Sequence, residues 1–180
     1  PRDTWRTGFP GKNASAGSPA ELRSFFERHP ELLGQTLVQE RIDAGDGHVL
    51  FVAAYVDGEG RVAGLFTGRK LRQYPPDRGV TCFGASEALP EAEGIARAFL
   101  AETGYSGFAA LEFAVDRTSG EVWFLELNPR TFFPNQLFAD AGVDLAWIAW
   151  RDLTGQAPEP PPRQIDGVRW LDFERDVGCF

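Results

Sequence analysis

The feature that most constrains the fold is a pair of short segments in which apolar residues alternate with other residues, Phe108–Asp116 and Glu121–Leu127. This alternation is typical of half-buried strands, and the Arg-Thr-Ser-Gly between the segments favours a turn. We therefore predict an antiparallel hairpin with one wholly apolar face. The predicted cross-strand pairs on that face are Leu111 with Leu127, Phe113 with Leu125, and Val115 with Trp123.

The same pairing places two carboxylates on the other face of the hairpin, with Glu112 opposite Glu126 and Asn128 two residues further on. Residues directly opposite in a strand pair lie about 5 Å apart, so the two acidic groups would repel each other. Magnesium, which prefers carboxylate oxygens, phosphate oxygens and water, would relieve this repulsion. Arg130, at the strand end, could meet an anionic ligand. The alternative is an ordinary hairpin with solvated glutamates on its surface.

Composition limits the class of protein. The chain has 180 residues, 43% of them hydrophobic, and a formal net charge of −8. This length suits one ordinary domain with a real core, and the acidic balance argues against non-specific nucleic-acid binding. The two cysteines are too few for a disulfide framework, so we read them as buried or incidental thiols and expect a reducing cytoplasm. No apolar run approaches the ~20 residues of a membrane helix.

Patterns elsewhere predict further elements around this hairpin. Ser18, with Glu21 three residues later, is typical of a helix start, and Gly142 would break or bend a later helix. The predicted helices are 19–28, 90–103 and 134–153, the predicted further strands are 36–42, 48–56 and 61–71, and residues 74–84 are predicted to be irregular. The sum is an α+β fold, a mainly antiparallel sheet flanked by helices. Residues 1–155 form its main part, and residues 156–180 form a proline-rich linker and the start of a further segment.

Three motifs carry a resemblance to a known superfamily. Gly104-Tyr105-Ser106-Gly107, then Leu111-Glu112-Phe113, then Phe124-Leu125-Glu126-Leu127-Asn128-Pro129-Arg130 resemble the C-terminal part of an ATP-grasp domain. Carbamoyl-phosphate synthase large chains, biotin carboxylases and carboxylate–amine ligases belong to this superfamily. The resemblance implies ATP and Mg²⁺, or Mn²⁺, as cofactors. It also implies small-molecule carboxylate and amine (or thiol) substrates that are joined through an acyl phosphate.

The resemblance assigns roles to the residues of the hairpin and to one lysine. Glu112, Glu126 and Asn128 resemble the magnesium ligands that bridge the ATP phosphates. Arg130 resembles the residue that holds the acceptor carboxylate and the transferring phosphoryl group. Lys70, in the basic segment 68–79, resembles the basic residue for the nucleotide phosphates. The alternative for Lys70 is a solvated basic strand edge.

The resemblance also implies a nucleotide site in the first part of the chain. The segment with Gln39, Glu40 and Ile42 resembles the strand whose backbone reads adenine, and Asp46 resembles the acidic residue for the ribose hydroxyls. Lys12, in a glycine-rich start, resembles the charged residue of a loop that closes over the phosphates. The alternatives are an ordinary turn aspartate at Asp46 and a frayed terminus around Lys12.

The sequence departs from the superfamily at its start. A preceding α/β domain and a strand ending in Lys-Pro are usual there, and neither is in the sequence. We therefore expect this chain to supply the nucleotide and magnesium half of a ligase site that needs a missing N-terminal portion of the same enzyme. Two other hypotheses stay open: a non-catalytic nucleotide- or partner-binding domain that keeps the fold, and a metal-binding or structural domain unrelated to ATP.

Overall fold

The computed structural model describes residues 14–76, 79–157 and 160–180, and Lys12 lies outside them. The chain divides into two compact units, Pro1–Arg41 and Ile42–Phe180. In the first unit, helix α2 (Pro19–Arg28) is followed by the short 3-10 helix η1 (Pro30–Leu32). The Ser18 side chain accepts a hydrogen bond from the backbone N–H of Glu21, which confirms the predicted helix start.

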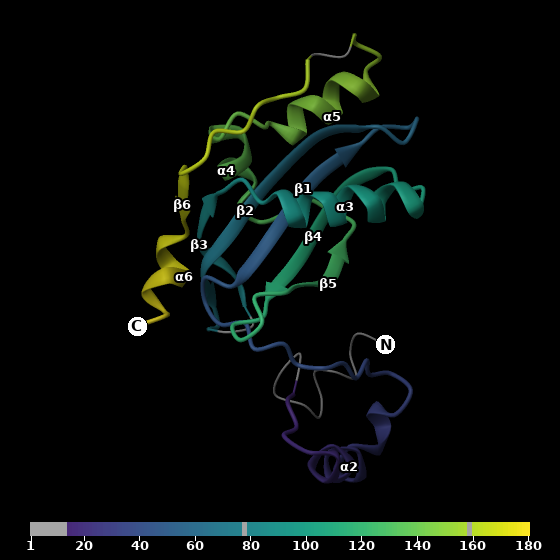
Figure 1. Ribbon diagram of the computed structural model, residues 1–180, viewed down its shortest axis with the longest axis vertical. Helices are drawn as coiled ribbons and strands as arrows, with labels where there is room; N and C mark the ends of the chain where they lie inside the picture. Colours follow the sequence, from purple (N-terminus) through teal and green to yellow (C-terminus); the bar gives the residue numbers. More distant parts are fainter. Residues whose placement is uncertain (1–13, 77–78, 158–159) are drawn as a thin grey trace. The chain divides into compact units, whose positions relative to one another are not determined.

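The second unit is built on a six-stranded antiparallel sheet with the order β5-β4-β1-β2-β3-β6 (Figure 1). The strands are β1 (Val49–Val56), β2 (Val62–Tyr74), β3 (Val80–Ser86), β4 (Gly107–Val115), β5 (Val122–Asn128) and β6 (Arg169–Leu171). The turn predicted between β1 and β2 is present. Its Asp57 carboxylate accepts hydrogen bonds from the backbone N–H groups of Glu59 and Arg61.

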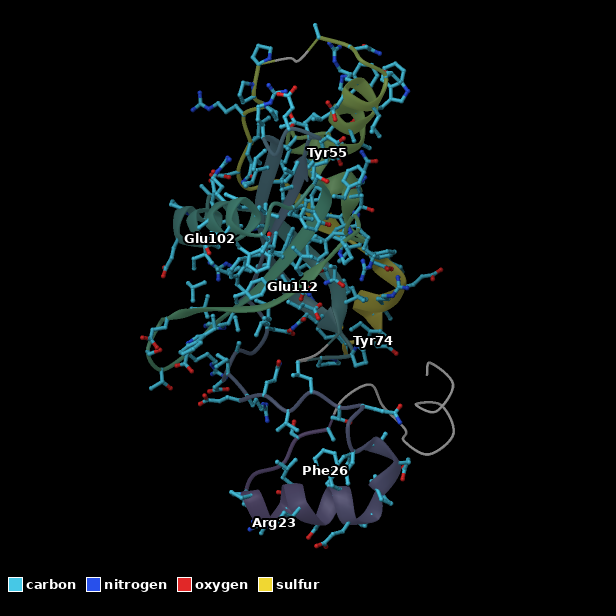
Figure 2. The ribbon with its side chains drawn as sticks, turned by 90° about the vertical axis from the view of Figure 1, so that its right-hand side faces the viewer. Arg23, Phe26, Tyr55, Tyr74, Glu102 and Glu112 are labelled. Atoms are coloured by element: carbon cyan, nitrogen blue, oxygen red, sulfur yellow. The ribbon has the colours of Figure 1, made fainter. Side chains whose placement is uncertain are left out.

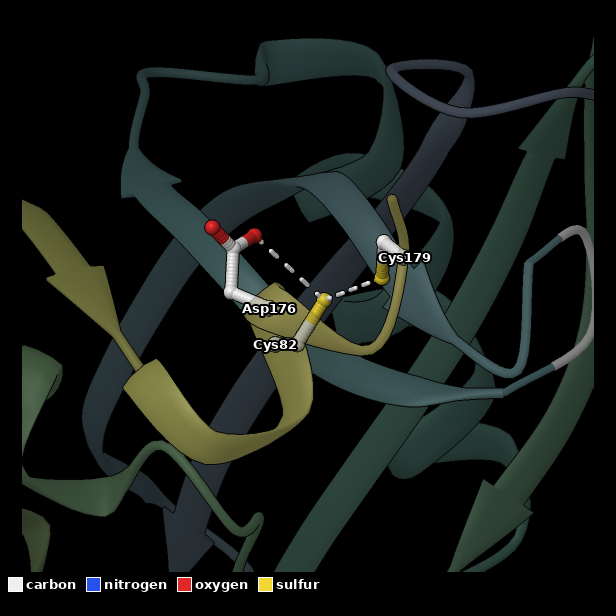
Figure 3. Close-up of side chains that lie close together, drawn as sticks. All are labelled: Cys82, Asp176 and Cys179. Atoms are coloured by element: carbon white, nitrogen blue, oxygen red, sulfur yellow. Dashed lines mark hydrogen bonds between the residues drawn. The ribbon is translucent and has the colours of Figure 1, made fainter.

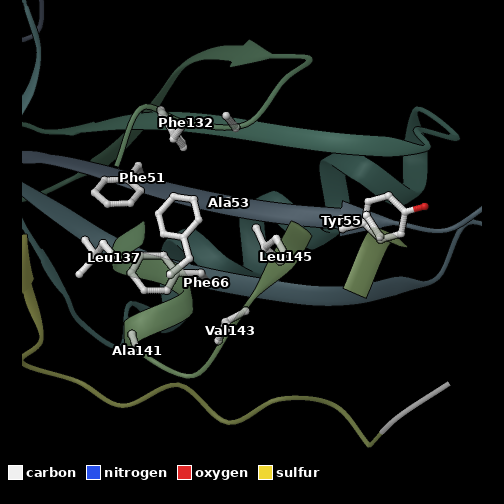
Figure 4. Packing of buried hydrophobic residues seen from close by; sticks show 12 residues of the cluster. Phe51, Ala53, Tyr55, Phe66, Phe132, Leu137, Ala141, Val143 and Leu145 are labelled. Carbon is white, nitrogen blue, oxygen red and sulfur yellow. The ribbon is translucent and has the colours of Figure 1, made fainter. Parts of the chain in front are cut away.

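Helices cover both faces of this sheet, so β1 is buried along its whole length. Helix α3 (Pro90–Glu102) packs on the face that carries Leu50 and Val52, and α4 (Asn135–Asp140) and α5 (Leu145–Leu153) pack on the face that carries Phe51 and Tyr55. Figure 4 shows the second of these clusters, in which the rings of Phe66 and Phe138 are 4.5 Å apart. Alternate side chains of β1 thus belong to two hydrophobic clusters, one on each face of the sheet.

Gly142 divides the predicted helix 134–153 into α4 and α5, as its position in the sequence indicates. Its φ of 86° is a conformation that side-chain-bearing residues rarely adopt. Asp144 then caps α5 by accepting a hydrogen bond from the Trp147 backbone N–H at 3.0 Å. No helix in the described part of the chain is both long and apolar enough to cross a membrane.

Two of the predicted segments are wrong. Residues 36–45 form neither strand nor helix, and the apolar side chains of Leu37 and Val38 are 83% and 55% exposed. A strand needs a partner and a buried face, and these exposed side chains lack the buried face. Residues 80–84, the later part of the segment predicted to be irregular, belong to β3, because the Cys82 and Thr81 side chains are buried against the sheet.

Residues beyond the proline-rich stretch join the same sheet. Strand β6 pairs with β3 through Phe83–Leu171, Gly84–Trp170 and Ala85–Arg169. Helix α6 (Phe173–Val177) follows, and the Asp172 carboxylate caps it by accepting a hydrogen bond from the Arg175 backbone N–H. The composition of the sequence places a boundary at residue 155. The segment after this boundary contributes β6, an edge strand, to the sheet.

Candidate functional site

The carboxylate pair lies on neighbouring strands as predicted. Glu112 on β4 is the register partner of Glu126 on β5, and Leu111 pairs with Leu127. The register shifts after Glu112, so Phe113 pairs with Phe124 and Val115 pairs with Val122. The predicted pairs Phe113–Leu125 and Val115–Trp123 are therefore wrong.

A β-bulge is the physical reason for this shift, because it inserts one extra residue into one strand of the pair. With Leu125 as the extra residue, Phe124 lies on the side of Phe113 and of α3. Its ring is 5.1 Å from Phe99 and 5.7 Å from Phe113, although Phe124 is still 39% exposed and Trp123 45% exposed. The bulge leaves the Glu112–Glu126 pairing intact and repositions the strand only beyond it.

Glu112 is ion-paired with Lys70 across the central strand. Lys70 on β2 pairs with Val49, Glu112 on β4 pairs with Phe51, and both side chains therefore share one face of the sheet. The Lys70 Nζ lies 2.6 Å from Glu112 Oε2, and the two side chains are only 4% and 16% exposed. A buried ammonium group needs such a partner, because desolvation without one is costly. Figure 2 marks Glu112 in the sheet, well away from Tyr55 at the α5 end.

Glu126, Asn128 and Arg130 form a hydrogen-bonded row. The Asn128 Nδ2 group donates to Glu126 Oε1 at 2.8 Å, and the Arg130 Nη2 group donates to Asn128 Oδ1 at 3.2 Å. Arg130 Nη1 also donates to the Thr131 carbonyl oxygen at 3.2 Å. Glu126 and Arg130 are exposed, so solvent and ligands can reach the carboxylate and the guanidinium group.

The donor set suits a hard divalent cation. Glu112, Glu126 and Asn128 offer carboxylate and amide oxygens from two paired strands, and magnesium binds such oxygens. Lys70 already balances the charge of Glu112, whereas Glu126 accepts a hydrogen bond from the neutral amide of Asn128. A cation would therefore bring further positive charge to the exposed end of this group.

The turn that carries Asp46 is anchored to β2 at Lys70. The Gly47 backbone N–H donates to the Lys70 carbonyl oxygen at 3.0 Å, and the Gly47 carbonyl oxygen accepts from Arg69 Nη1 at 2.8 Å. Asp46 is exposed beside this anchor, and Ile42 is partly buried four residues earlier in the same unit. The structure thus brings Asp46 to the end of the sheet where β2 carries Lys70.

Gln39 and Glu40 are exposed residues of the first unit, in the segment that forms no strand. The strand that the resemblance implied for these two residues and Ile42 is therefore wrong. A role of their backbone in nucleotide binding remains a prediction, as does the role of Lys12.

The basic segment holds contacts that the sequence did not reveal. Arg69 points to the opposite face from Lys70, as alternation predicts, and forms two hydrogen bonds to Glu87, at 2.6 and 2.7 Å. These bonds hold the pKa of the Glu87 carboxyl below its ordinary value. Arg72 binds Asp176 from the C-terminal segment at 2.6 and 2.9 Å. The sequence carried no signal for these partners, because Asp176 lies 104 residues from Arg72.

No protein-family model matches the chain. Among curated proteins, acetyl-CoA carboxylase 2 of Oryza sativa subsp. japonica is 31% identical over 115 residues, which is 61% of this chain and 5% of that protein. The chain therefore spans a small part of the relative it matches.

The solved structures give the fold. Pyruvate carboxylase T882A of Rhizobium etli with acetyl coenzyme A matches 82% of this chain and 14% of its own, with 20% identity and a TM-score of 0.62. Biotin carboxylase of Campylobacter jejuni, as its β-γ-ATP complex, matches 78% and 33%, with 19% identity and a TM-score of 0.58. N5-carboxyaminoimidazole synthetase of Staphylococcus aureus with ADP matches 82% and 38%, with 11% identity and a TM-score of 0.58. All are ATP-grasp enzymes.

The chain has the ATP-grasp fold. Its sheet carries the Glu112–Glu126 pair on the same face as Phe51, with Lys70 reaching Glu112 across β1. The α+β architecture expected from the sequence is thereby confirmed. The matched share of each of these three structures is 38% or less, so the chain corresponds to part of a larger protein in each of them.

Proposed function

We propose that this chain supplies the nucleotide- and magnesium-binding half of an ATP-dependent ligase, which joins a carboxylate to an amine or thiol through an acyl phosphate. The observation that carries the proposal is the register pairing of Glu112 with Glu126, beside Asn128 and Arg130. Lys70 balances the charge of Glu112, but the opposed Glu126 adds a second carboxylate, from which a purely structural hairpin gains nothing. Relatives crystallised with ATP or ADP, and one with magnesium ADP, support the nucleotide part.

In this proposal Glu112, Glu126 and Asn128 hold Mg²⁺, for which Mn²⁺ can substitute. The metal supplies neutralisation of the phosphate charge, which phosphoryl transfer needs more than covalent help from the protein. Lys70 holds nucleotide phosphate oxygens. Because Lys70 is bound to Glu112, its ammonium group is already positioned beside the metal ligands.

The nucleotide itself is assigned to the segment before β1. The backbone of Gln39, Glu40 and Ile42 holds adenine, Asp46 holds the ribose hydroxyls, and Lys12 closes over the phosphates. The position of the Asp46 turn on Lys70 supports the ribose assignment, because it keeps sugar and phosphate contacts close together.

Arg130 is assigned to the acceptor. The substrate carboxylate oxygen attacks the γ-phosphorus of ATP, the bond to the β-phosphate bridging oxygen breaks, and ADP leaves. The amine or thiol then attacks the acyl carbon and displaces phosphate. The exposed Arg130 guanidinium group, held by Asn128 and Thr131, holds the substrate carboxylate and the phosphoryl oxygens during transfer. We also propose a reducing compartment, the cytoplasm, because both cysteines are free.

The test is a calorimetric titration of the protein with ATP, with and without Mg²⁺. We expect magnesium-dependent binding that Glu126→Gln weakens by about 10-fold or more, because the variant removes one charged ligand. Glu121→Gln is the matched control, since Glu121 is another exposed glutamate of the same hairpin and lies outside the carboxylate pair. Equal magnesium-dependent affinity in Glu126→Gln and the wild type would overturn the metal assignment.

The second candidate is a non-catalytic nucleotide- or partner-binding domain. It predicts the same binding but no reaction. An assay of the protein together with the N-terminal portion that we expect it to need separates the ligase from the non-catalytic domain. Only the ligase releases ADP continuously in a manner that depends on both a carboxylate and an amine. Candidate carboxylates and amines are therefore screened together and singly, with ADP release as the measurement.

A further inference from the structure

A second cluster of potential metal ligands lies where the C-terminal segment meets the sheet. Cys82 projects from β3, and Asp176 and Cys179 come from α6 and the residues after it (Figure 3). Their ligand atoms all lie within 4.8 Å of one another. Cys82 and Asp176 are buried, and Cys179 is partly buried. The site proposed for magnesium uses none of these three residues.

The distances in this cluster fit a tetrahedral metal. The two sulfur atoms are 3.5 Å apart, and Cys82 Sγ is 3.9 Å from Asp176 Oδ1. With Zn–S bonds of about 2.3 Å, tetrahedral zinc places two sulfur ligands about 3.8 Å apart, and a sulfur and an oxygen ligand about 3.6 Å apart. These two distances are therefore close to those that such an ion requires, and the third pair, Cys179 with Asp176, lies within 4.8 Å. A disulfide would instead require the sulfur atoms to approach to about 2 Å.

The charges of the cluster also suit a divalent ion. Arg72 binds both oxygens of Asp176, so the metal-free cluster of two thiols, one carboxylate and one guanidinium group is neutral. Replacing the two thiol protons by one divalent cation leaves two thiolates, the carboxylate, the guanidinium group and the metal, and this set is also neutral. The exchange therefore adds no uncompensated charge to a buried place.

The neighbours of the cluster provide the remaining contacts. Arg72 would orient the Asp176 carboxylate, as hydrogen-bonding partners of metal ligands do. The carbonyl oxygen of Gln73 accepts a hydrogen bond from Cys179 Sγ at 3.4 Å, so it lies close enough to serve as the fourth ligand if water does not. Thiolate ligands select zinc and similar ions over magnesium.

We propose that Cys82, Asp176 and Cys179 form a structural binding site for Zn²⁺ that fastens the C-terminal segment to β2 and β3. Binding releases the two thiol protons to solvent and involves no oxidation. The site is separate from the proposed ligase function, because neither Glu126 nor a nucleotide takes part in it. Its consequence for the fold is mechanical: it holds β2 at Arg72, two residues beyond Lys70.

The test uses Co²⁺ as a spectroscopic substitute for zinc. The chain, purified with reductant and stripped of metal by a chelator, is titrated with Co²⁺ and then with Zn²⁺ without oxygen. We expect one Co²⁺ per chain by native mass spectrometry, thiolate-to-cobalt charge-transfer absorption, and displacement by Zn²⁺ but not by Mg²⁺. Zinc at about 100 times its dissociation constant should raise the unfolding temperature by about 5–10 °C.

Two variants distinguish the site from general effects on the segment. Cys179→Ser removes one sulfur at the least buried ligand and should weaken Co²⁺ binding by about 100-fold or more. Because Cys82 remains as a thiolate ligand, the charge-transfer absorption at saturating Co²⁺ should fall well below that of the wild type. Asp172→Asn is the matched control. It perturbs α6 but keeps a good capping residue and all three ligands, so it should bind Co²⁺ as the wild type does.

Three outcomes would overturn the proposal. The folded, reduced chain could bind no Co²⁺, Cys179→Ser could bind Co²⁺ with the affinity and the charge-transfer absorption of the wild type, or Mg²⁺ could displace the bound ion. Recovery of the two thiols as a Cys82–Cys179 disulfide after the reduced chain has failed to take up Co²⁺ would assign the pair to redox chemistry instead.

Discussion

At the scale of single residues, each cation of the basic segment on β2 has its own carboxylate. Arg69 binds Glu87, Lys70 binds Glu112, and Arg72 binds Asp176. The sequence suggested that this positive charge would serve phosphates, but its first effect is to pair each cation with a carboxylate, and the Lys70–Glu112 pair is the most buried of the three. Only the Lys70 pair adjoins the proposed magnesium site, because Glu112 is also the partner of Glu126.

Because of the Lys70–Glu112 pair, we expect Glu112 and Glu126 to contribute differently to the free energy of unfolding. We expect Glu112→Gln to lower the free energy of unfolding by about 3 kcal/mol, because it leaves the ammonium group of Lys70, which is 4% exposed, without its counter-charge. Glu126→Gln changes an exposed residue and should stay within about 0.5 kcal/mol of the wild type. Urea unfolding of both variants measures the difference. Equal losses would show that the ion pair contributes no net stability.

At the scale of elements, glycines on β2 allow close packing. A Cβ atom at Gly68 would lie 2.7 Å from both the Ala85 carbonyl oxygen and the Phe51 ring. A Cβ atom at Gly64 would lie 2.7 Å from Ile148 Cδ1 and 2.9 Å from a methyl group of Leu145, both on α5. A side chain at Gly68 would therefore meet backbone and a buried ring, whereas a side chain at Gly64 would meet the flexible ends of side chains.

This contrast predicts the order of two alanine variants. Gly68→Ala should lower the free energy of unfolding by about 2–3 kcal/mol, since neither a backbone oxygen nor a packed ring can move far. Gly64→Ala should cost less, about 1 kcal/mol, because the methyl groups on α5 can rotate away. Thermal or urea unfolding measures both changes. A larger loss in Gly64→Ala would mean that α5 is packed more rigidly than β3.

At the scale of the whole molecule, long-range ion pairs make the stability of the sheet depend on pH. Hydrogen bonds from Arg69 hold the pKa of Glu87 below its ordinary value, and those from Arg72 do the same for Asp176. A carboxyl group with a lower pKa in the folded chain stabilises the fold fully above its unfolded pKa, about 4. This contribution is lost as the pH falls through the folded value, so acid should destabilise the protein.

Glu87→Gln tests this dependence. Because the Glu87 side chain is 41% exposed, we expect a loss below about 1 kcal/mol at neutral pH. The variant should also lose less stability than the wild type between about pH 5 and 3, since it lacks a carboxylate to protonate. Unfolding temperatures across this range provide the comparison. Parallel curves for the two proteins would contradict the assigned effect of Arg69.

Local patterns in the sequence determined the pieces of this molecule. The alternation of the β4–β5 hairpin is enough to place Glu112 opposite Glu126. Ser18 marks the start of α2, and Gly142 separates α4 from α5. These features depend on neighbours within a few residues, so periodicity and backbone preference predict them.

Only the tertiary structure decided how the pieces meet. The sheet order β5-β4-β1-β2-β3-β6 brings Lys70 to Glu112, 42 residues away, and Arg72 to Asp176, 104 residues away. The same order places Cys82 against Cys179 and leaves residues 36–45 outside the sheet. Pairing between distant strands depends on which edges are free and which faces are buried. A single stretch of sequence carries neither fact, so the ion pairs and the thiol cluster appear only in the folded chain.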